Sequence, residues 1–497
     1  MMLPLFLHEL LSDQNCSCSA GFVVADASKE LSKDAIRKES LSIAAALSRF
    51  GVGHHHLVAV FLPEHASLAS AISAVSLVGA TAIPLSESIG SNRIKESLRF
   101  LGPSAVVHGG ATKELSALIA EFAWPAVDVR ELAQVEHETR TPTDLIDLDN
   151  GLAMLTSGTT AGRAKAVGMA HHSVLGVCEA IARYLEITAQ DRILMFSPAS
   201  FDYGLYQLFI AALRGARVDI PTNAARRFPG DLAKFIVERG ITVLPLTPAS
   251  SRQLVPVWQR APLHGVRLVT FTGSPFPSEL VEVFSATFPG ARIVPMYGIT
   301  EAKRCSYLPD EAYPGMLPSV GIPIPNSRIR VLDDEGNEVP PGRIGEFEIE
   351  SRSVMNGYIG EPDAATGCRL RGPGRRHLLT GDFGYRNEQG YLFWTGRGDD
   401  IVKVADKRIS IKEIEAALRT ARGVRDVAVL LDPKTGFLTA FVVSSEPAPD
   451  IEGLKKSAVA VLGEVSLVPK TIVFLDALPL TVNGKVDYHR LRENVTA

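Results

Sequence analysis

The sequence lacks the features that mark disulfide-rich or membrane-embedded proteins. Its five cysteines are too few and too scattered over 497 residues for a disulfide framework. Cys16 and Cys18 form a C-x-C pair, but no second pair completes a zinc site. No run of about 20 apolar residues is present, so we expect no membrane-spanning helix and no membrane partner.

The apolar start of the sequence, MMLPLFLHELL, contains no positively charged segment and soon reaches His8 and Glu9. It predicts a terminal amphipathic helix rather than a signal peptide, and we therefore expect a cytoplasmic protein.

The sequence also lacks a strong charge of either sign. Its formal net charge is only -4 and its isoelectric point is near 6.3, so no overall field attracts nucleic acid. An anionic ligand must therefore be met by a local site. The length of 497 residues and the hydrophobic content of 46% predict a sizeable core and more than one domain.

The first two thirds of the chain alternate between short buried strands and helical segments. The helical patterns include residues 39–52 and 65–80. Strands separated by helices predict parallel sheets covered on both faces, with ligands bound where strands end. The expected strands are 56–62, 81–85, 104–108, 151–158, 191–198, 216–221, 241–248, 266–273 and 291–298.

The pattern changes near Pro314. Residues 327–351 alternate apolar and polar side chains around a D-E-G-N turn, which is typical of an antiparallel hairpin. The last block, 399–497, combines two helices with three strands and has the size of a small domain. We predict an α/β fold: residues 1–398 form a large domain of stacked αβα parallel sheets with a small β-barrel-like part, and residues 399–497 form a small, mobile α+β domain.

The segment LTSGTTAGRAKAV, residues 155–167, has the composition of a phosphate-binding loop. Its glycines allow backbone N–H groups to turn toward an anion, and its hydroxyls, Arg163 and Lys165 add donors and charge. It is not a P-loop of the Walker type, because Ala166 follows Lys165 where that motif needs Ser or Thr.

Three further motifs occur in order after this loop: MYGITEAKR from Met296, LLTGDFGYRNEQGYLFWTGRGDDIVKV from Leu378, and LPLTVNGKVDYHRL from Leu478. Together they resemble the adenylate-forming superfamily, which includes acyl-CoA synthetases, peptide-synthetase adenylation domains and luciferases. The resemblance covers nearly the whole chain. It implies an enzyme that joins a carboxylic acid to AMP at the expense of ATP.

The resemblance also implies an ATP site. Thr300 would contact the α-phosphate, Glu301 would hold Mg²⁺, Asp382 would accept from the ribose hydroxyls, and Arg397 would add a ribose or phosphate contact. The β- and γ-phosphates would be held by Thr156, Ser157, Gly158, Thr159, Thr160 and Lys165. Adenine would be bound by Tyr297, Gly298, Gly273, Ser274 and Pro275.

Two lysines are expected to serve two successive steps. Adenylation brings a carboxylate against a phosphate, and these two anions repel, so cations must screen them. By resemblance, Lys485 would reach the reacting oxygens in the first step. A rotation at the hinge residue Asp399 would then withdraw Lys485 and present Lys403 for the second step.

The nature of the acceptor stays open between an amine and a thiol. Asp406 stands where the family usually carries a glycine, beside the passage for a pantetheine arm. Its bulk and charge favour an amine acceptor, as in amide synthetases, over CoA or a carrier protein. Asp406 can equally be a harmless turn residue.

The acid is expected to bind near the segment SPASFDYGLYQLF. Asp202 would anchor a substrate ammonium, or it simply caps the next helix. Phe201, Tyr203 and Tyr206 suggest an aromatic-lined cleft for an aryl or heteroaryl acid, and His171 matches a family histidine. The competing function from another class is a non-catalytic nucleotide-binding protein that retained the fold.

Overall fold

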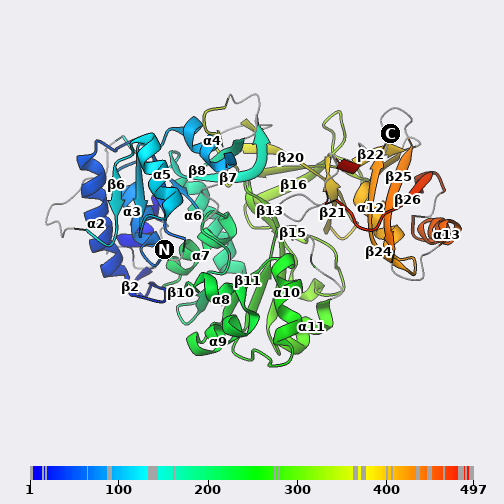
Figure 1. Ribbon diagram of the computed structural model, residues 1–497, viewed down its shortest axis with the longest axis horizontal. Helices are drawn as coiled ribbons and strands as arrows, with labels where there is room; N and C mark the ends of the chain where they lie inside the picture. Colours follow the sequence, from blue (N-terminus) through cyan, green and yellow to red (C-terminus); the bar gives the residue numbers. More distant parts are fainter. Residues whose placement is uncertain are drawn as a thin grey trace. The chain divides into compact units, whose positions relative to one another are not determined.

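The structure is a computed structural model (Figure 1). It describes residues 4–13, 16, 19–63, 65–86, 92–132, 144–160, 163–273, 276, 280–361, 368–370, 376–398, 401–404, 407–431, 437–444, 450–462, 465–479, 486 and 490–491. The chain divides into two compact units. Unit 1 comprises Met1–Ile329 and Glu348–Leu379, and unit 2 comprises Arg330–Phe347 and Thr380–Ala497. The domain boundary that the sequence predicts at Asp399 lies outside the described residues and stays a prediction.

Unit 1 contains a nine-stranded sheet that is parallel in its centre. The central strands β1, β10, β9, β11, β12 and β13 run parallel, whereas β2, β14 and β15 are antiparallel to their neighbours. In order across the sheet the strands are β15 (Ile322–Pro323), β14 (Lys303–Tyr307), β13 (Arg292–Ile299), β12 (Leu268–Phe271), β11 (Val243–Leu246), β9 (Arg192–Leu194), β10 (Arg217–Asp219), β1 (Val23–Ala25) and β2 (Glu30–Ser32).

One face of this sheet is covered by the helices α9 (Pro229–Arg239), α10 (Pro248–Trp258) and α11 (Val281–Thr287), which Figure 1 shows beside β11. Helix α10 begins where Thr247 accepts a hydrogen bond from the Ser250 amide, with Pro248 at its first position. Trp258 and Phe284 are almost fully buried against Phe271 of β12 in one apolar core. This burial holds β11, β12 and β13 in place, and the candidate site described below includes residues of these strands.

A second sheet of seven strands lies in the same unit. Its strands β7, β4, β3, β5 and β6 are parallel, and β8 and β18 are antiparallel. The order is β18 (Gly357–Tyr358), β8 (Arg163–Ala170), β7 (Asn150–Thr160), β4 (Thr81–Pro84), β3 (Leu57–Phe61), β5 (Ala105–His108) and β6 (Ala126–Asp128). The remaining helices of unit 1 are α1 (Leu7–Ser12), α2 (Lys33–Arg49), α3 (Leu68–Leu77), α4 (Asn92–Leu101), α5 (Lys113–Phe122), α6 (His171–Tyr184), α7 (Asp202–Ala212) and α8 (Asn223–Arg227).

Five strands form a third sheet around the predicted hairpin, and the division between the units runs through β16, β17 and β20. The strands are β16 (Ser327–Leu332), β17 (Gly345–Ser351), β19 (Cys368–Leu370), β20 (Arg376–Arg386) and β21 (Leu392–Arg397). β16 and β17 are neighbours, so the expected pairing of residues 327–351 is confirmed.

The end of the chain has a core of its own. Strands β24 (Val424–Leu431), β25 (Leu438–Ser444) and β26 (Thr471–Phe474) form a small sheet, and β22 (Ile401–Val404) pairs with β23 (Lys407–Ser410). Helices α12 (Ile411–Arg419) and α13 (Ile451–Leu462) bury apolar side chains against the three-stranded sheet. The predicted fold class, a large α/β part with parallel sheets and a small α+β part, is confirmed. Among the described helices, none is long and apolar enough to cross a bilayer.

Two histidines are buried where α1 packs on the seven-stranded sheet and α3. His8 Nδ1 lies 2.9 Å from Ser76 Oγ, and the Leu7 amide donates to His171 Nδ1 over 3.5 Å. Burial lowers the pKa of His8 to about 4 and the pKa of His171 to about 3. Both rings therefore stay neutral at physiological pH.

We predict that the protein loses stability as the pH falls below the ordinary histidine pKa of about 6.5, because the unfolded chain takes up protons that the buried rings exclude. Each histidine lowers the free energy of unfolding by at most about 1.4 kcal/mol per pH unit, down to its folded-state pKa. Urea unfolding followed by tryptophan fluorescence at several pH values measures this slope. His171→Asn keeps an acceptor for the Leu7 amide and should reduce the slope, whereas His264→Asn at an exposed position should not. An equal slope in both variants would contradict the assignment.

Candidate active site

The predicted phosphate-binding segment forms part of the β7–β8 hairpin. Leu155 pairs with Ala166 and Thr159 pairs with Ala164, so the register shifts between them. Thr156, Ser157 and Gly158 therefore lie opposite the single residue Lys165. A bulge of this kind leaves backbone groups outside the ladder and bends the strand locally. The Thr156 hydroxyl is buried and has no hydrogen-bond partner among the described residues.

Lys165 is linked to Glu301 through Tyr358. The Lys165 Nζ lies 4.5 Å from the centre of the Tyr358 ring, within the range of a cation–π contact. The Tyr358 hydroxyl donates to Glu301 Oε1 over 2.9 Å. Tyr358 reaches this position because β18 pairs with β8, with Tyr358 opposite Val167. The structure thus brings two predicted site residues, Lys165 and Glu301, onto opposite sides of one tyrosine.

Thr300 and Glu301 lie at the tip of the β13–β14 hairpin. Ile299 pairs with Lys303, which leaves a three-residue loop, and the Ala302 amide donates to the Ile299 carbonyl over 3.1 Å. Lys303 has a φ of 65°, the left-handed conformation that often closes such a loop. The Met355 amide donates to the Glu301 carbonyl over 2.7 Å and fixes the tip from the other side.

Gly298 is required because the backbones of β13 and β14 approach each other closely at this position. A Cβ atom at Gly298 would lie 1.9 Å from the Lys303 carbonyl oxygen, which no side chain tolerates. The neighbouring Tyr297 is buried on β13, and Gly273 at the end of β12 is exposed with a φ of 99°. Ser274 and Pro275, the other predicted adenine contacts, lie outside the described residues.

Asp382 and Arg397 form a pair within unit 2. They are opposite each other on β20 and β21, and Arg397 Nη1 donates to Asp382 Oδ1 over 3.0 Å. Asp382 is only 2% exposed, and its backbone amide donates to Thr380 Oγ1 over 3.0 Å. The two predicted ribose contacts are therefore brought together by strand register.

Several predicted residues fall outside the part of the chain that the structure describes. Asp399, Asp406 and Lys485 are among the residues without a described position. The side chains, though not the backbone, are likewise outside it for Ser157, Gly158, Thr159, Thr160 and Lys403. Their assigned roles stay predictions.

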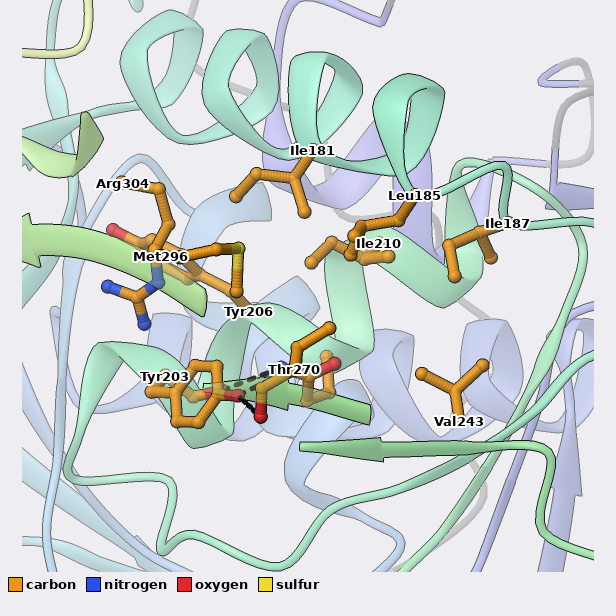
Figure 2. Close-up of a pocket in the computed structure, with 11 residues that line it drawn as sticks. Ile181, Leu185, Ile187, Tyr203, Tyr206, Ile210, Val243, Thr270, Met296 and Arg304 are labelled. Atoms are coloured by element: carbon orange, nitrogen blue, oxygen red, sulfur yellow. Dashed lines mark hydrogen bonds between the residues drawn. The ribbon is translucent and has the colours of Figure 1, made fainter. Parts of the chain in front are cut away.

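Two of the predicted acid-binding residues line a buried cavity between α6, α7 and the nine-stranded sheet (Figure 2). Tyr203 and Tyr206 contribute aromatic walls, and the Tyr203 hydroxyl donates to the Thr270 carbonyl over 2.8 Å. The cavity leaves about 10 Å³ for the centre of a water molecule, close to what one buried water needs. The remaining lining residues are Ile181, Leu185, Ile187, Gln207, Ile210, Val243, Thr270, Met296 and Arg304.

Asp202 lies at the start of α7 and faces a cation rather than open space. Its Oδ1 atom is 3.7 Å from Arg304 Nη2, and both side chains are buried. The Arg304 guanidinium also stacks 4.7 Å from the Tyr203 ring centre. Phe201, by contrast, is 60% exposed and does not line the cavity. His171 is fully buried against the edge of Phe6, away from this group of side chains.

Sequence analysis missed Tyr358 and Arg304. Tyr358 belongs to an N-G-Y sequence that carries no distinctive signal, and its contact with Glu301 spans 57 positions. Arg304 ends the quoted MYGITEAKR motif, but a surface arginine would look the same in the sequence. The sequence around Arg304 gave no signal of burial, because β14 reads KRCSY, yet the structure buries it from Lys303 to Ser306.

Comparison with models of protein families identifies the family of this chain. A model described as "AMP-binding enzyme" matches residues 14–359, and one described as "AMP-binding enzyme C-terminal domain" matches residues 413–485. The chain belongs to the AMP-binding enzyme family. The predicted membership of the adenylate-forming superfamily is confirmed.

Relatives of this AMP-binding enzyme include much longer proteins. It is 30% identical over 487 residues to the phenyloxazoline synthase MbtB of Mycolicibacterium paratuberculosis, covering 93% of this chain and 40% of that protein. The chain spans less than half the length of the first curated relatives it matches.

Solved structures of similar length share the fold. The amide bond synthetase McbA from Marinactinospora thermotolerans matches with a TM-score of 0.82 and 23% identity, covering 99% of each chain. The o-succinylbenzoate CoA synthetase MenE from Bacillus subtilis, in complex with its acyl-adenylate intermediate, matches with a TM-score of 0.80 and 23% identity, covering 98% of each chain. At this level of identity the two solved structures show that the fold is shared.

We predict that Gly298→Ala destabilises unit 1 by at least about 2 kcal/mol and abolishes ATP-dependent activity, because the new methyl group forces β13 away from β14. Thermal unfolding and pyrophosphate release measure the two effects. Gly176→Ala is the matched control: it lies in α6 with no atom within 4 Å of the added Cβ, and it should be neutral or slightly stabilising. A Gly298→Ala protein that melts and turns over like the parent would contradict the close crossing.

Proposed function

We propose that the enzyme activates an aryl or heteroaryl carboxylic acid as its acyl-adenylate and transfers the acyl group to an amine. In the first step a carboxylate oxygen attacks the α-phosphorus of ATP and pyrophosphate leaves. In the second, the amine nitrogen attacks the acyl carbon, AMP leaves, and the amine proton passes to solvent. The connection from Lys165 through Tyr358 to Glu301 is the observation that supports this proposal most, because it joins phosphate-binding and metal-binding chemistry.

The β7–β8 hairpin would hold the β- and γ-phosphates. The bulge at Thr156, Ser157 and Gly158 supplies backbone and hydroxyl donors, and Lys165 lies directly across the ladder. The unpaired, buried hydroxyl of Thr156 supports this role, since buried polar groups without partners are rare outside functional sites. Thr159 and Thr160 would add neutral donors, and Lys165 would add positive charge.

Glu301 fits a magnesium site. Its carboxylate is a hard oxygen ligand at a hairpin tip, and the Tyr358 hydroxyl fixes one of its oxygens. Bound Mg²⁺ would screen the negative charge of the phosphates. Thr300, next to it, would donate to the α-phosphate. Tyr358 keeps the carboxylate in place while ATP and acid enter.

The nucleoside would be bound by the predicted adenine and ribose residues. Tyr297 and Gly298 would contact adenine, with Gly273, Ser274 and Pro275 on its other side. Asp382 would accept from the ribose hydroxyls, and the ion pair with Arg397 supports this role because it orients the buried carboxylate.

Residues 399–497 are proposed to form a separate, mobile domain with its hinge at Asp399. Lys485 would approach the carboxylate and α-phosphate oxygens during adenylation. Lys403 would take its place during acyl transfer, after rotation of this domain. The separate apolar core between α12, α13 and the three-stranded sheet supports movement as one body.

The second candidate acceptor is a thiol, from CoA or a carrier protein. The match to a phenyloxazoline synthase favours a carrier, whereas the fold match to an amide bond synthetase and the charge of Asp406 favour an amine. We place the enzyme in the cytoplasm, where ATP is available; Cys16, Cys178 and Cys305 are free thiols.

The proposal predicts pyrophosphate release that requires both an acid and ATP. A panel of aryl and heteroaryl acids, each assayed with amines, with CoA and without acceptor, should give amides in excess of thioesters. Lys485→Ala should abolish adenylation while transfer from a synthetic acyl-adenylate survives, because the lysine serves only the first step. ATP binding without any acid-dependent turnover would instead indicate a nucleotide-binding protein. Efficient thioester formation would overturn the amine preference alone.

Tyr358→Phe isolates the hydrogen bond to Glu301. We predict a loss of pyrophosphate release of roughly tenfold or more, and a higher Mg²⁺ requirement, because a hydrogen bond to a charged group is lost. The melting temperature should change little, since the ring stays under Lys165. Tyr307→Phe is the control: this tyrosine also lies on a strand of unit 1, but it stacks on Tyr184 instead. If both variants show the same Mg²⁺ titration as the parent, Tyr358 does not position the metal ligand.

A further inference from the structure

We propose that Arg304 selects carboxylic acids that carry a hydrogen-bond acceptor at the end remote from the reacting carboxylate, and rejects acids that carry an ammonium group. The inference rests on the proposed function and names the substrate class of that site. It follows from the hydrogen bonds, the charges and the walls of the cavity in Figure 2.

Arg304 is the unsatisfied donor of this cavity. The side chain is 3% exposed and comes from β14, inside the nine-stranded sheet. Its Nη2 atom has no hydrogen-bond partner among the described residues, since Asp202 Oδ1 at 3.7 Å is too distant. Asp202 Oδ2 is likewise buried without a partner. A buried guanidinium N–H without an acceptor is costly, and such groups occur where a ligand completes the set.

The other polar groups of the cavity are already paired. The Tyr203 hydroxyl bonds the Thr270 carbonyl at 2.8 Å and lies 2.7 Å from Thr270 Oγ1. The Gln207 amide donates to the Tyr203 carbonyl over 2.9 Å. Arg304 is therefore the charged group of this cavity that has donor capacity left for a ligand atom.

The charges around the cavity do not favour an ammonium. Asp202 carries the negative charge, but Arg304 already compensates it. A second cation, Lys303, is fully buried on the same strand and donates to the Ser353 carbonyl over 2.6 Å. Two cations beside one carboxylate attract an acceptor and repel an ammonium.

The walls define the shape of the group that enters. In Figure 2, Arg304, Met296 and Tyr203 lie on one side, and Ile187 and Val243 lie on the other. The cavity holds about one water-sized atom beyond the side chains. A compact acceptor, such as a carbonyl oxygen or a ring nitrogen, fits beside the guanidinium. A larger acid needs Met296, the flexible side chain of the group, to move.

The test compares acids in pairs of equal shape. In the first comparison, one acid of each pair carries a ring nitrogen or a carbonyl oxygen where the other has a C–H or CH₂ group. In the second comparison, α-amino acids are paired with their desamino analogues. The readout is kcat/KM for acid-dependent pyrophosphate release. The parent enzyme should prefer the acceptor-bearing acid by at least about tenfold, because its analogue leaves the guanidinium unpaired. It should disfavour the ammonium-bearing acid by a similar factor.

Two variants are compared with the parent. Arg304→Met removes the guanidinium but leaves the buried charge of Asp202 uncompensated, which can impair folding. The double variant Asp202→Asn with Arg304→Met also removes that charge. In a folded variant the preference should fall to about one, with the KM for ATP unchanged. Arg183→Met, at an exposed position on α6, should retain the preference. Turnover with equal preference in parent and folded variants would overturn the inference and leave the proposed function intact. An absence of turnover with every acid would overturn both.

Discussion

The pairing of β18 with β8 is the contact on which the candidate site depends. It places Tyr358 between the hairpin that carries Lys165 and the hairpin tip that carries Glu301. Tyr358 bonds to one carboxylate oxygen of Glu301 and offers its ring face to the ammonium of Lys165. Without this strand, the cation and the carboxylate would have no common support, because each sits at the end of a different sheet.

Buried charge also shapes the cavity lined by Tyr203, Tyr206 and Arg304. Asp202, Lys303 and Arg304 are all within the interior of unit 1, where an uncompensated charge is costly. Arg304 compensates Asp202 electrostatically but at 3.7 Å it is not hydrogen-bonded. The aromatic and apolar walls keep water away from this pair. A buried charged group with an unused hydrogen-bond donor can distinguish between ligands. A ligand with an acceptor completes the hydrogen bond, whereas a ligand without one leaves the buried donor unpaired.

Much of the fold was predictable from the order of apolar segments. The strand pattern identified β3, β4, β5, β7, β9, β10, β11, β12 and β13, since short apolar runs between helices bury on both faces. The sequence also indicated Thr300, Glu301, Asp382 and Arg397 as one functional set, and the register of β20 with β21 brings Asp382 and Arg397 together. It did not indicate the bulge after Leu155 or the continuation of the strand to Thr160, because the composition there is that of a loop.

The sequence by itself determined the family and the α/β class, because both depend on residue types in a fixed order. Only the tertiary structure decided which side chains serve as partners. Tyr358 meets Glu301, and Arg304 meets Asp202 across 102 positions, through strand pairing and helix packing that leave no local pattern. His171 was indicated by the sequence as an acid-site residue, yet it packs beside Phe6, because burial against α1 depends on contacts 164 positions apart.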